Sequence, residues 1–141
     1  MADRDTHKKV KVGVKVGGGP PPGYQWNIEV LDIAYEEARE FLDEDQYEHL
    51  ASQFRELARQ VDPTHSETID VRPIEDFHEL RDKWGILRRL NVRVFFLVHK
   101  ERRTIVVLGA MNKQNEGPTP LGDRVRARFR MRHYLESLKL G

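Results

Sequence analysis

The chain has 141 residues, 38% hydrophobic and 33% charged, which is enough for one globular domain with a real core. It contains no cysteine, which excludes disulfides, thiolate metal ligands and a cysteine nucleophile and fits a reducing cytoplasm. It has no apolar run of about 18 residues, so we expect no membrane-spanning helix. Residues 1–16 are basic but lack a continuous apolar segment, so we expect no secretory signal there.

Charge is distributed unevenly along the chain, although the formal net charge is only +1. Residues 24–79 hold four basic and sixteen acidic side chains, whereas residues 80–141 hold fifteen basic and five acidic ones. The basic half suggests a polyanionic partner, most often nucleic acid. The alternative is that the two halves neutralise each other across an internal interface.

Residues 1–23 have the composition of a basic tail. Valine alternates with lysine and glycine over residues 9–16, and a run of glycine and proline follows at residues 17–23. We interpret this part as a flexible extension, with a native strand as the alternative. Residues 24–141 are then expected to form a single domain.

The first half of that domain predicts one strand and a helical hairpin. Apolar residues alternate over Tyr24–Leu31, which indicates a strand with one wet side. Residues Ile33–Leu42 predict a short helix, and Asp45–Val61 has the clearest helical periodicity in the chain. The expected buried stripe of this second helix comprises Tyr47, Leu50, Ala51, Phe54, Leu57, Ala58 and Val61.

The middle of the chain predicts a short strand followed by a central hairpin. Glu67–Arg72 is expected to be a strand that ends at Pro73, and Phe77–Trp84 a turn or a single helical turn. Val92–His99 and Thr104–Met111 are the two most apolar runs, and four charged residues separate them. They predict a hairpin of two buried strands covered on both faces.

Arg93 lies in the first strand of this hairpin, and alternation places it on the same face as Phe95 and Leu97. With residues 100–103 as the turn, Arg93 pairs with Ala110, and Asn112 shares its face. A buried arginine is costly unless it is paired or has a function. A plain ion pair with a local carboxylate is the alternative to a functional role.

The last segment carries conflicting signals. Arginine alternates with other residues from 124 to 132, which is strand periodicity. Thr119 as N-cap, Pro120 at the first helical position and the apolar spacing favour a helix instead. The expected buried stripe of that helix is Ala127, Met131, Tyr134, Leu135 and Leu138.

The sequence therefore predicts an α+β fold in the order β-α-α-β-β-β-α. A small, mostly antiparallel sheet carries an N-terminal helical hairpin packed on it and a C-terminal helix.

Several kinds of chemistry find no support in the sequence. The glycine triplet at residues 17–19 precedes prolines rather than a helix, so it is not a phosphate loop. No serine has the pattern of a nucleophile elbow. The histidines lack the spacing of metal ligands, so we expect no metal site and no cofactor; they are His7, His49, His65, His78, His99 and His133.

A basic cluster on and near the central strands is the remaining candidate site. Arg93 and Lys113 belong to the hairpin and its end, and Arg81, Arg88 and Arg89 precede it. Such a group can hold a phosphate and stabilise negative charge that develops in a transition state.

These residues carry a resemblance to a known family. His78-Glu79-Leu80-Arg81, Val92-Arg93-Val94-Phe95-Phe96, the strand up to Gly109, Lys113 and Thr119-Pro120 resemble, in order and spacing, the RelE/ParE toxin superfamily. The HigB-like, phage-derived branch is the most similar. The resemblance covers residues 24–140 approximately.

The resemblance implies the toxin of a type II toxin–antitoxin pair, a metal-independent endoribonuclease that cuts mRNA on the ribosome. The RNA's own 2′-hydroxyl would attack the scissile phosphate, which Arg81 and Arg93 would bind with help from Lys113. The implied partners are mRNA, the ribosome and a cognate antitoxin, expected to be a helix-turn-helix protein. Operator DNA would be bound only through the antitoxin complex, and no membrane is involved.

Further contacts to RNA are expected from Arg88, Arg89, Asn112 and an arginine stripe, which comprises Arg124, Arg128 and Arg132. His133 and Tyr134 are candidate acid/base residues, because histidine titrates near neutral pH. Two positions depart from the family pattern: Val92 stands where tyrosine is common, and Asn112 where a first lysine is common. These departures keep two alternatives open, a non-catalytic binding module for nucleic acid or protein and a ParE-like gyrase inhibitor.

Overall fold

The structure is a computed structural model that describes residues 19–82, 90–113 and 117–140. It confirms the predicted α+β class, with two helices early in the chain and one at the end. The elements in chain order are β1 (Asn27–Val30), α2 (Asp32–Phe41), α3 (Glu44–Ala58), β2 (Asp70–Ile74), β3 (Phe77–Asp82), β4 (Val92–His99), β5 (Thr104–Asn112) and α4 (Leu121–Leu140). None of the helices in these described ranges is long and apolar enough to cross a membrane.

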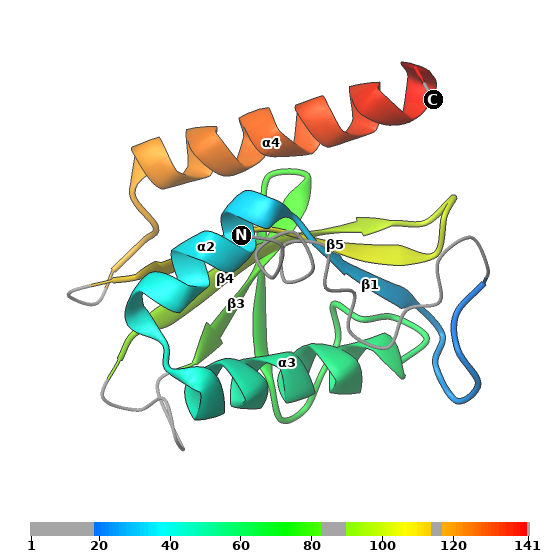
Figure 1. Cartoon of the computed structure of the whole chain (residues 1–141), viewed down its shortest axis with the longest axis horizontal. Coiled ribbons are helices and arrows are strands. Elements are labelled where there is room, and N and C mark those ends of the chain that lie inside the picture. Colours follow the sequence, from blue (N-terminus) through cyan, green and yellow to red (C-terminus); the bar gives the residue numbers. More distant parts are fainter. Residues whose placement is uncertain (1–18, 83–89, 114–116, 141) are drawn as a thin grey trace, which may run out of the picture.

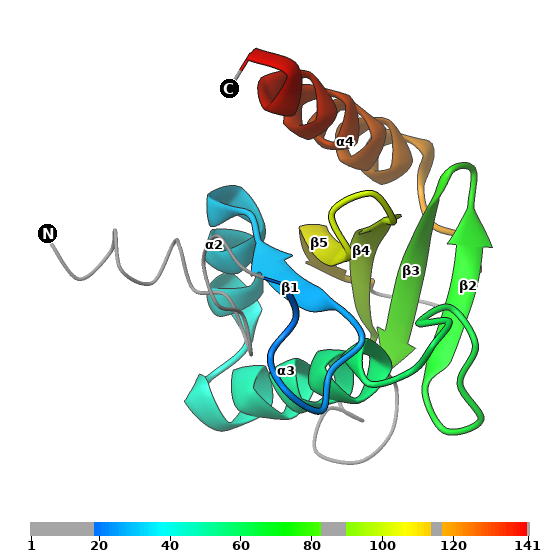
Figure 2. The same cartoon turned by 90° about the vertical axis from the view of Figure 1, so that its right-hand side faces the viewer.

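The five strands form one sheet in the order β1-β5-β4-β3-β2 (Figures 1 and 2). The β4–β5 hairpin lies inside the sheet, as its two apolar runs predict, and residues 100–103 make its turn. β1 pairs with β5 in parallel, and every other pairing is antiparallel.

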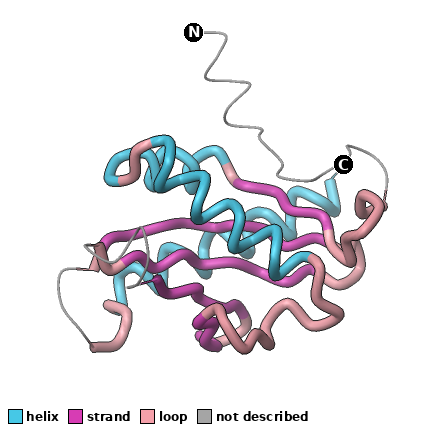
Figure 3. The backbone as a smooth tube through the Cα atoms, turned by 90° about the horizontal axis from the view of Figure 1, so that it is seen from below, coloured by secondary structure: helices cyan, strands magenta, loops and turns pink. Residues whose placement is uncertain are grey.

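Each face of the sheet is covered by helix. α2 and α3 pack on the face that carries Val92, Val94 and Phe96. α4 packs on the opposite face, against Phe95 and Leu97. Figure 1 shows α4 and α3 on opposite sides of the strands, and in Figure 3 α3 crosses in front of them. The face assignment expected from alternation in β4 is therefore confirmed.

The stretch from Phe77 to Asp82 is a strand, so the expectation of a turn or a helical turn was wrong. β3 pairs with both β2 and β4, and buried residues occur on both of its sides. Glu79 is 0% exposed and Leu80 is buried beside it. The strand was missed because one of its buried residues is charged, and an analysis of periodicity counts glutamate as a surface residue.

The ends of two elements and the burial of one side chain also differ from expectation. β2 continues through Pro73, which an edge strand tolerates because one row of its backbone groups needs no partner. α3 ends at Ala58, so Val61 lies beyond the helix and is exposed rather than buried. Asn27 is buried on the side of β1 that was expected to be wet, the side where Tyr134 of α4 donates to Glu29.

A β-bulge in β5 changes the register of the hairpin. His99 faces Thr104 as expected, but the pairing shifts between Phe95 and Phe96. Arg93 therefore pairs with Met111 rather than Ala110. One extra residue in a strand moves every later side chain to the other face.

An ion pair between α2 and α4 closes the edge of β5 where β1 ends. The Arg130 guanidinium donates to both carboxylate oxygens of Glu37, at 2.9 and 2.8 Å, and to the Leu108 carbonyl at 3.0 Å. Glu37 in turn accepts from the Ala110 amide at 3.1 Å. A β-carbon on Gly109 would lie 2.7 Å from an Arg130 nitrogen and 3.0 Å from a Glu37 oxygen. Glycine at 109 therefore gives these side chains room to reach the strand.

Candidate functional site

Arg81 and Arg93 lie directly opposite each other on neighbouring strands, β3 and β4. Residues paired in this way project from the same face of a sheet, here the face on which α4 packs. Two like charges at a cross-strand position repel each other unless an anion lies between them. The sequence prediction that these two arginines belong together in space agrees with this register.

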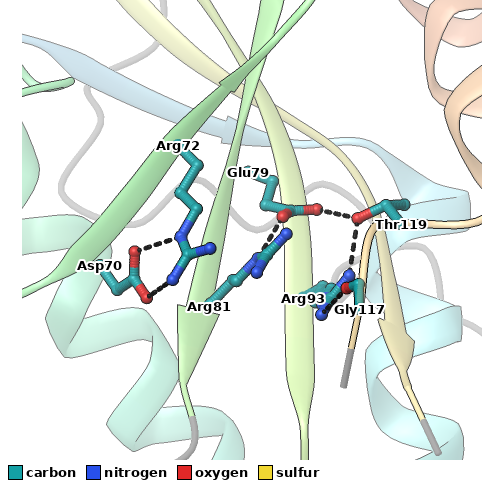
Figure 4. A network of polar contacts seen from close by, with 7 residues as sticks. All are labelled: Asp70, Arg72, Glu79, Arg81, Arg93, Gly117 and Thr119. Carbon is teal, nitrogen blue, oxygen red and sulfur yellow. Dashed lines mark hydrogen bonds and ion pairs between the residues drawn. The ribbon is translucent and has the colours of Figure 1, made fainter. Parts of the chain in front are cut away.

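Glu79 supplies the compensating negative charge. One of its carboxylate oxygens forms an ion pair with Arg81, and the other accepts a hydrogen bond from the Thr119 hydroxyl (Figure 4). The same Thr119 oxygen accepts from Arg93 at 3.0 Å. A single hydroxyl thus links the two halves of the cluster. We call this cluster of polar contacts the β2–β4 network, and its members are Asp70, Arg72, Glu79, Arg81, Arg93, Gly117 and Thr119.

Arg93 is only 1% exposed, and its guanidinium is enclosed. Besides the bond to Thr119, it donates to the Gly117 carbonyl at 2.7 Å. The expectation of an arginine in direct contact with a phosphate is not met by this arrangement. Arg93 instead ties residues 117 and 119 to the centre of the sheet.

Thr119 does not cap α4 as expected: the helix begins at Leu121, and the Thr119 hydroxyl bonds to Glu79 and Arg93. The first helical amides bond instead to the Pro120 carbonyl, from Asp123 and Arg124. The threonine of the Thr-Pro motif therefore belongs to the β2–β4 network rather than to the helix.

The exposure of the arginine side chains in this network rises toward the edge of the sheet. Arg81 on β3 is 13% exposed, and Arg72 on the edge strand β2 is 49% exposed. Arg72 forms a two-pronged ion pair with Asp70, at 3.0 and 3.1 Å. In register, Arg72 faces Glu79 and Asp70 faces Arg81. Arg72 was not expected at the site, because its only sequence signal is a basic residue in a short predicted strand.

Lys113 lies at the same end of the sheet. Its amide donates to the Asn91 carbonyl at 2.8 Å, which continues the β4–β5 pairing one residue past Asn112. Lys113 follows Met111 by two residues, so alternation places it on the face of Arg93. The three residues expected to act in catalysis, Arg81, Arg93 and Lys113, therefore share one face and one end of the sheet.

Asn112 lies on the opposite face, which corrects the expectation that it sits beside Arg93. The bulge pairs it with Val92, and its side-chain oxygen accepts from the Asn91 amide at 3.0 Å. This contact fixes the start of β4. Arg88 and Arg89, also expected to bind RNA, lie outside the described residues.

The expected arginine stripe is present on α4, although its members differ in their surroundings. Arg124 is half-buried, whereas Arg132 is exposed. Arg128 forms an ion pair with Glu75, which occupies a turn with a φ of 55°. The stripe therefore runs beside the β2–β3 turn.

Tyr134 does not reach the network. Its hydroxyl accepts from Arg102 at 2.8 Å and donates to Glu29, and its ring contacts His99. His99 ends β4 about 20 Å from Arg93 at the rise of an extended strand. Burial, and then the charge of Glu29, raises the pKa of Tyr134. This residue is part of the core, as its place in the apolar stripe predicts, and cannot be an acid or base at the network.

His133, the other candidate acid/base residue, is exposed on α4 and lies beside Phe129. It is not a member of the β2–β4 network. No described residues form a group of three or more histidine and carboxylate side chains that could hold a metal ion.

At this end of the sheet the partly exposed Arg81 guanidinium, fixed by Glu79, is the group that can bind an anion. Compared with models of known protein families the sequence matches none, and it has no match among curated proteins.

Proposed function

We propose that this protein is the toxin of a type II toxin–antitoxin pair, an endoribonuclease that cuts mRNA on the ribosome in the cytoplasm. The observation that carries the proposal is the gathering of Arg81, Arg93 and Lys113 at one end of the sheet face that carries α4. The strand and helix order and the spacing of the short motifs support it.

Arg81 is the group that binds the scissile phosphate in this proposal. Its side chain is partly open to solvent, and Glu79 holds its Nε, which leaves the outer guanidinium nitrogens for a phosphate. Lys113 adds positive charge from the end of β5, which lies on the other side of β4 from β3. Arg93 acts as a positioning residue behind them, because it fixes the segment that carries Thr119.

The reaction needs no nucleophile from the protein. The ribose 2′-oxygen attacks the adjacent phosphorus, and the bond from phosphorus to the 5′-oxygen breaks. The 2′-hydroxyl proton goes to solvent, and the leaving 5′-oxygen takes a proton from solvent. One fragment ends in a 2′,3′-cyclic phosphate and the other begins with a 5′-hydroxyl. The Arg81 guanidinium stabilises the extra negative charge on the phosphoryl oxygens in the transition state.

The partners of this activity are mRNA and the ribosome. A cognate antitoxin, a helix-turn-helix protein, neutralises the toxin, and operator DNA is bound only by their complex. The metal-free reaction agrees with the absence of metal-ligand spacing in the sequence.

Expression of the chain in a bacterial cell tests this proposal. We expect growth arrest and transcripts cut within translated regions, and both effects should be lost in Arg81→Gln. Arg55→Gln is the matched control, because Arg55 is also ion-paired but lies on α3, on the other side of the sheet. Normal growth and intact transcripts with the wild-type chain would overturn the proposal.

A second candidate, a non-catalytic RNA-binding module, is favoured by the enclosure of Arg93. A nuclease of this class needs cations that reach the substrate. Both terminal guanidinium nitrogens of Arg93 bond to protein atoms instead. This candidate predicts RNA binding that falls steeply with rising salt, without cleavage products.

A further inference from the structure

α4 carries large apolar side chains on its outer surface as well as on its buried one. Ala127, Met131 and Tyr134 pack on the sheet, as expected for an amphipathic helix. The outer surface carries an exposed ridge at spacings of four residues, formed by Leu121, Val125 and Phe129. Exposed apolar side chains that are contiguous on one helix usually mark a binding surface.

Phe129 is the most prominent member of this ridge, with 67% of its surface exposed. One turn further along the helix, the His133 ring lies 6.4 Å from the Phe129 ring between centroids, at 27° from parallel. Two adjacent rings held nearly parallel on a helix surface offer a flat π-face to a third planar group.

The surroundings of this ring pair are strongly basic. α4 holds six arginine and lysine residues against two acidic ones. Arg126 and Arg132 are exposed on the same outer side of the helix, and Arg126 forms an ion pair there with Asp123. Arg128 lies nearby but is held by Glu75 at the β2–β3 turn. A ligand that fits this surface combines flat aromatic groups with regularly spaced negative charges.

We propose that Phe129 and His133 form a stacking platform for an unpaired base of single-stranded RNA, with Arg126 and Arg132 contacting the flanking phosphates. Every base has a π-face, so such platforms bind single strands with little sequence preference. An acidic protein segment could pair with the arginines and pack on Leu121 and Val125, but it would leave the Phe129 and His133 ring pair unexplained. The assignment gives a separate binding role to a surface outside the β2–β4 network, and it rests on the proposed function only for the choice of RNA.

Phe129→Leu and Phe129→Tyr form the test pair. Leucine keeps the apolar surface but removes the ring, whereas tyrosine keeps the ring. Fluorescence anisotropy measures the affinity of each purified protein for a labelled single-stranded RNA of about ten nucleotides. A double-stranded RNA of the same length is the second probe, and Val61→Ala, at an exposed apolar position outside α4, is the control.

We expect Phe129→Leu to weaken single-strand binding by about tenfold, because stacking on one aromatic side chain contributes about 1–3 kcal/mol per base. Phe129→Tyr and Val61→Ala should bind as the wild type does, and the duplex should bind more weakly. The platform is overturned if the wild type does not bind the single strand, or if it binds the duplex equally well. Equal affinity of Phe129→Leu and wild type would overturn it too, as would equal losses in the leucine and tyrosine variants, which would point to a protein ligand.

Cleavage is measured in parallel, so that the two proposals can fail separately. A wild-type chain that binds RNA through Phe129 but cuts nothing would overturn the nuclease and leave the platform. A wild-type chain that cuts RNA while Phe129→Leu binds normally would overturn the platform alone.

Discussion

Thr119 uses one hydroxyl to join two charged side chains in the interior. It donates to Glu79 and accepts from Arg93, and all three residues are buried. A buried carboxylate without its hydrogen bonds is costly, because the protein interior offers no water in exchange. The network therefore depends on a residue type that carries both a donor and an acceptor.

Thr119→Val keeps the shape of the side chain and removes the hydroxyl. We expect it to lower the free energy of unfolding by about 1–3 kcal/mol, because Glu79 and Arg93 each lose a bond. Urea denaturation measures the effect. Thr119→Ser retains the hydroxyl and should cost clearly less; similar losses in both variants would show that the methyl group, not the hydrogen bonds, matters.

Tyr47 allows the effect of burying one phenol to be tested at alkaline pH. Burial, and then the nearby Tyr35, raises the pKa of Tyr47 from 10.0 to about 12. The phenol therefore ionises first in the unfolded chain, and its contribution to stability is present below pH 10 and lost as the pH rises toward 12. Tyr47→Phe should flatten the fall in unfolding free energy over this range. An unchanged pH profile in the variant would show that Tyr47 titrates normally in the folded protein.

The ion pair between Glu37 and Arg130, which we call the clamp, joins the helices α2 and α4. Glu37 and Arg130 are both partly buried, and they hold two helices against the part of β5 that β1 does not cover. The pair substitutes side-chain hydrogen bonds for a missing neighbouring strand. Because edge strands expose unpaired backbone groups, such a cover also hinders association through the edge.

Glu37→Ala should lower the free energy of unfolding by about 1–3 kcal/mol, since bonds to a charged partner are lost. It should also speed hydrogen exchange at the Ala110 amide, which loses its acceptor. Glu40→Ala is the control, because Glu40 is exposed on the same helix. Equal exchange rates at Ala110 in the two variants would contradict the clamp.

Two glycine substitutions are expected to have opposite effects. Gly109→Ala places a β-carbon against the clamp and should destabilise the protein by about 1–3 kcal/mol. Gly122→Ala lies in the first turns of α4 with open space around it and should stabilise the protein by up to about 1 kcal/mol. Thermal unfolding separates them, and a stabilising Gly109→Ala would show that Arg130 and Glu37 move aside at little cost.

Most elements could be predicted from the sequence because their burial follows a simple period. The buried stripe of α4 prevailed over the alternating arginines, since a helix lets Ala127, Met131 and Tyr134 reach the sheet together. β3 was not predicted, because its buried Glu79 is satisfied partly by Thr119, which comes from a loop far along the chain. The bulge that moves Asn112 to the other face could not be predicted, because a continuous run of apolar residues gives no sequence signal for it.

The residues of the candidate site were partly predicted from the sequence, but the contacts between them were not. Arg81 was expected near Arg93 from its place before the hairpin and from the family resemblance. The strand pairing that sets the two arginines opposite each other was not expected, because β3 was not predicted. The enclosure of Arg93 depends on Gly117 and Thr119, which come from a loop that no local pattern connects to β4.

The charge asymmetry of the chain has two structural outcomes. Some of the basic half neutralises the acidic half internally, through Arg130 with Glu37, Arg128 with Glu75 and Arg81 with Glu79. Other basic residues face solvent on the outer side of α4: Arg132 is exposed there, and Arg126 is exposed while it pairs with Asp123. Internal neutralisation thus holds for part of the basic half, and a polyanionic partner for the exposed part stays a prediction.

The chemical nature of the cut RNA ends tests the central proposal most directly. Purified protein is added to ribosomes translating a defined transcript, and the fragment ends are identified by enzymatic end-labelling. We expect 2′,3′-cyclic phosphate and 5′-hydroxyl ends, formed at a rate about a hundredfold lower with Arg81→Gln. Fragments with 5′-phosphate ends, or an Arg81→Gln variant that cuts as fast as the wild type, would contradict it.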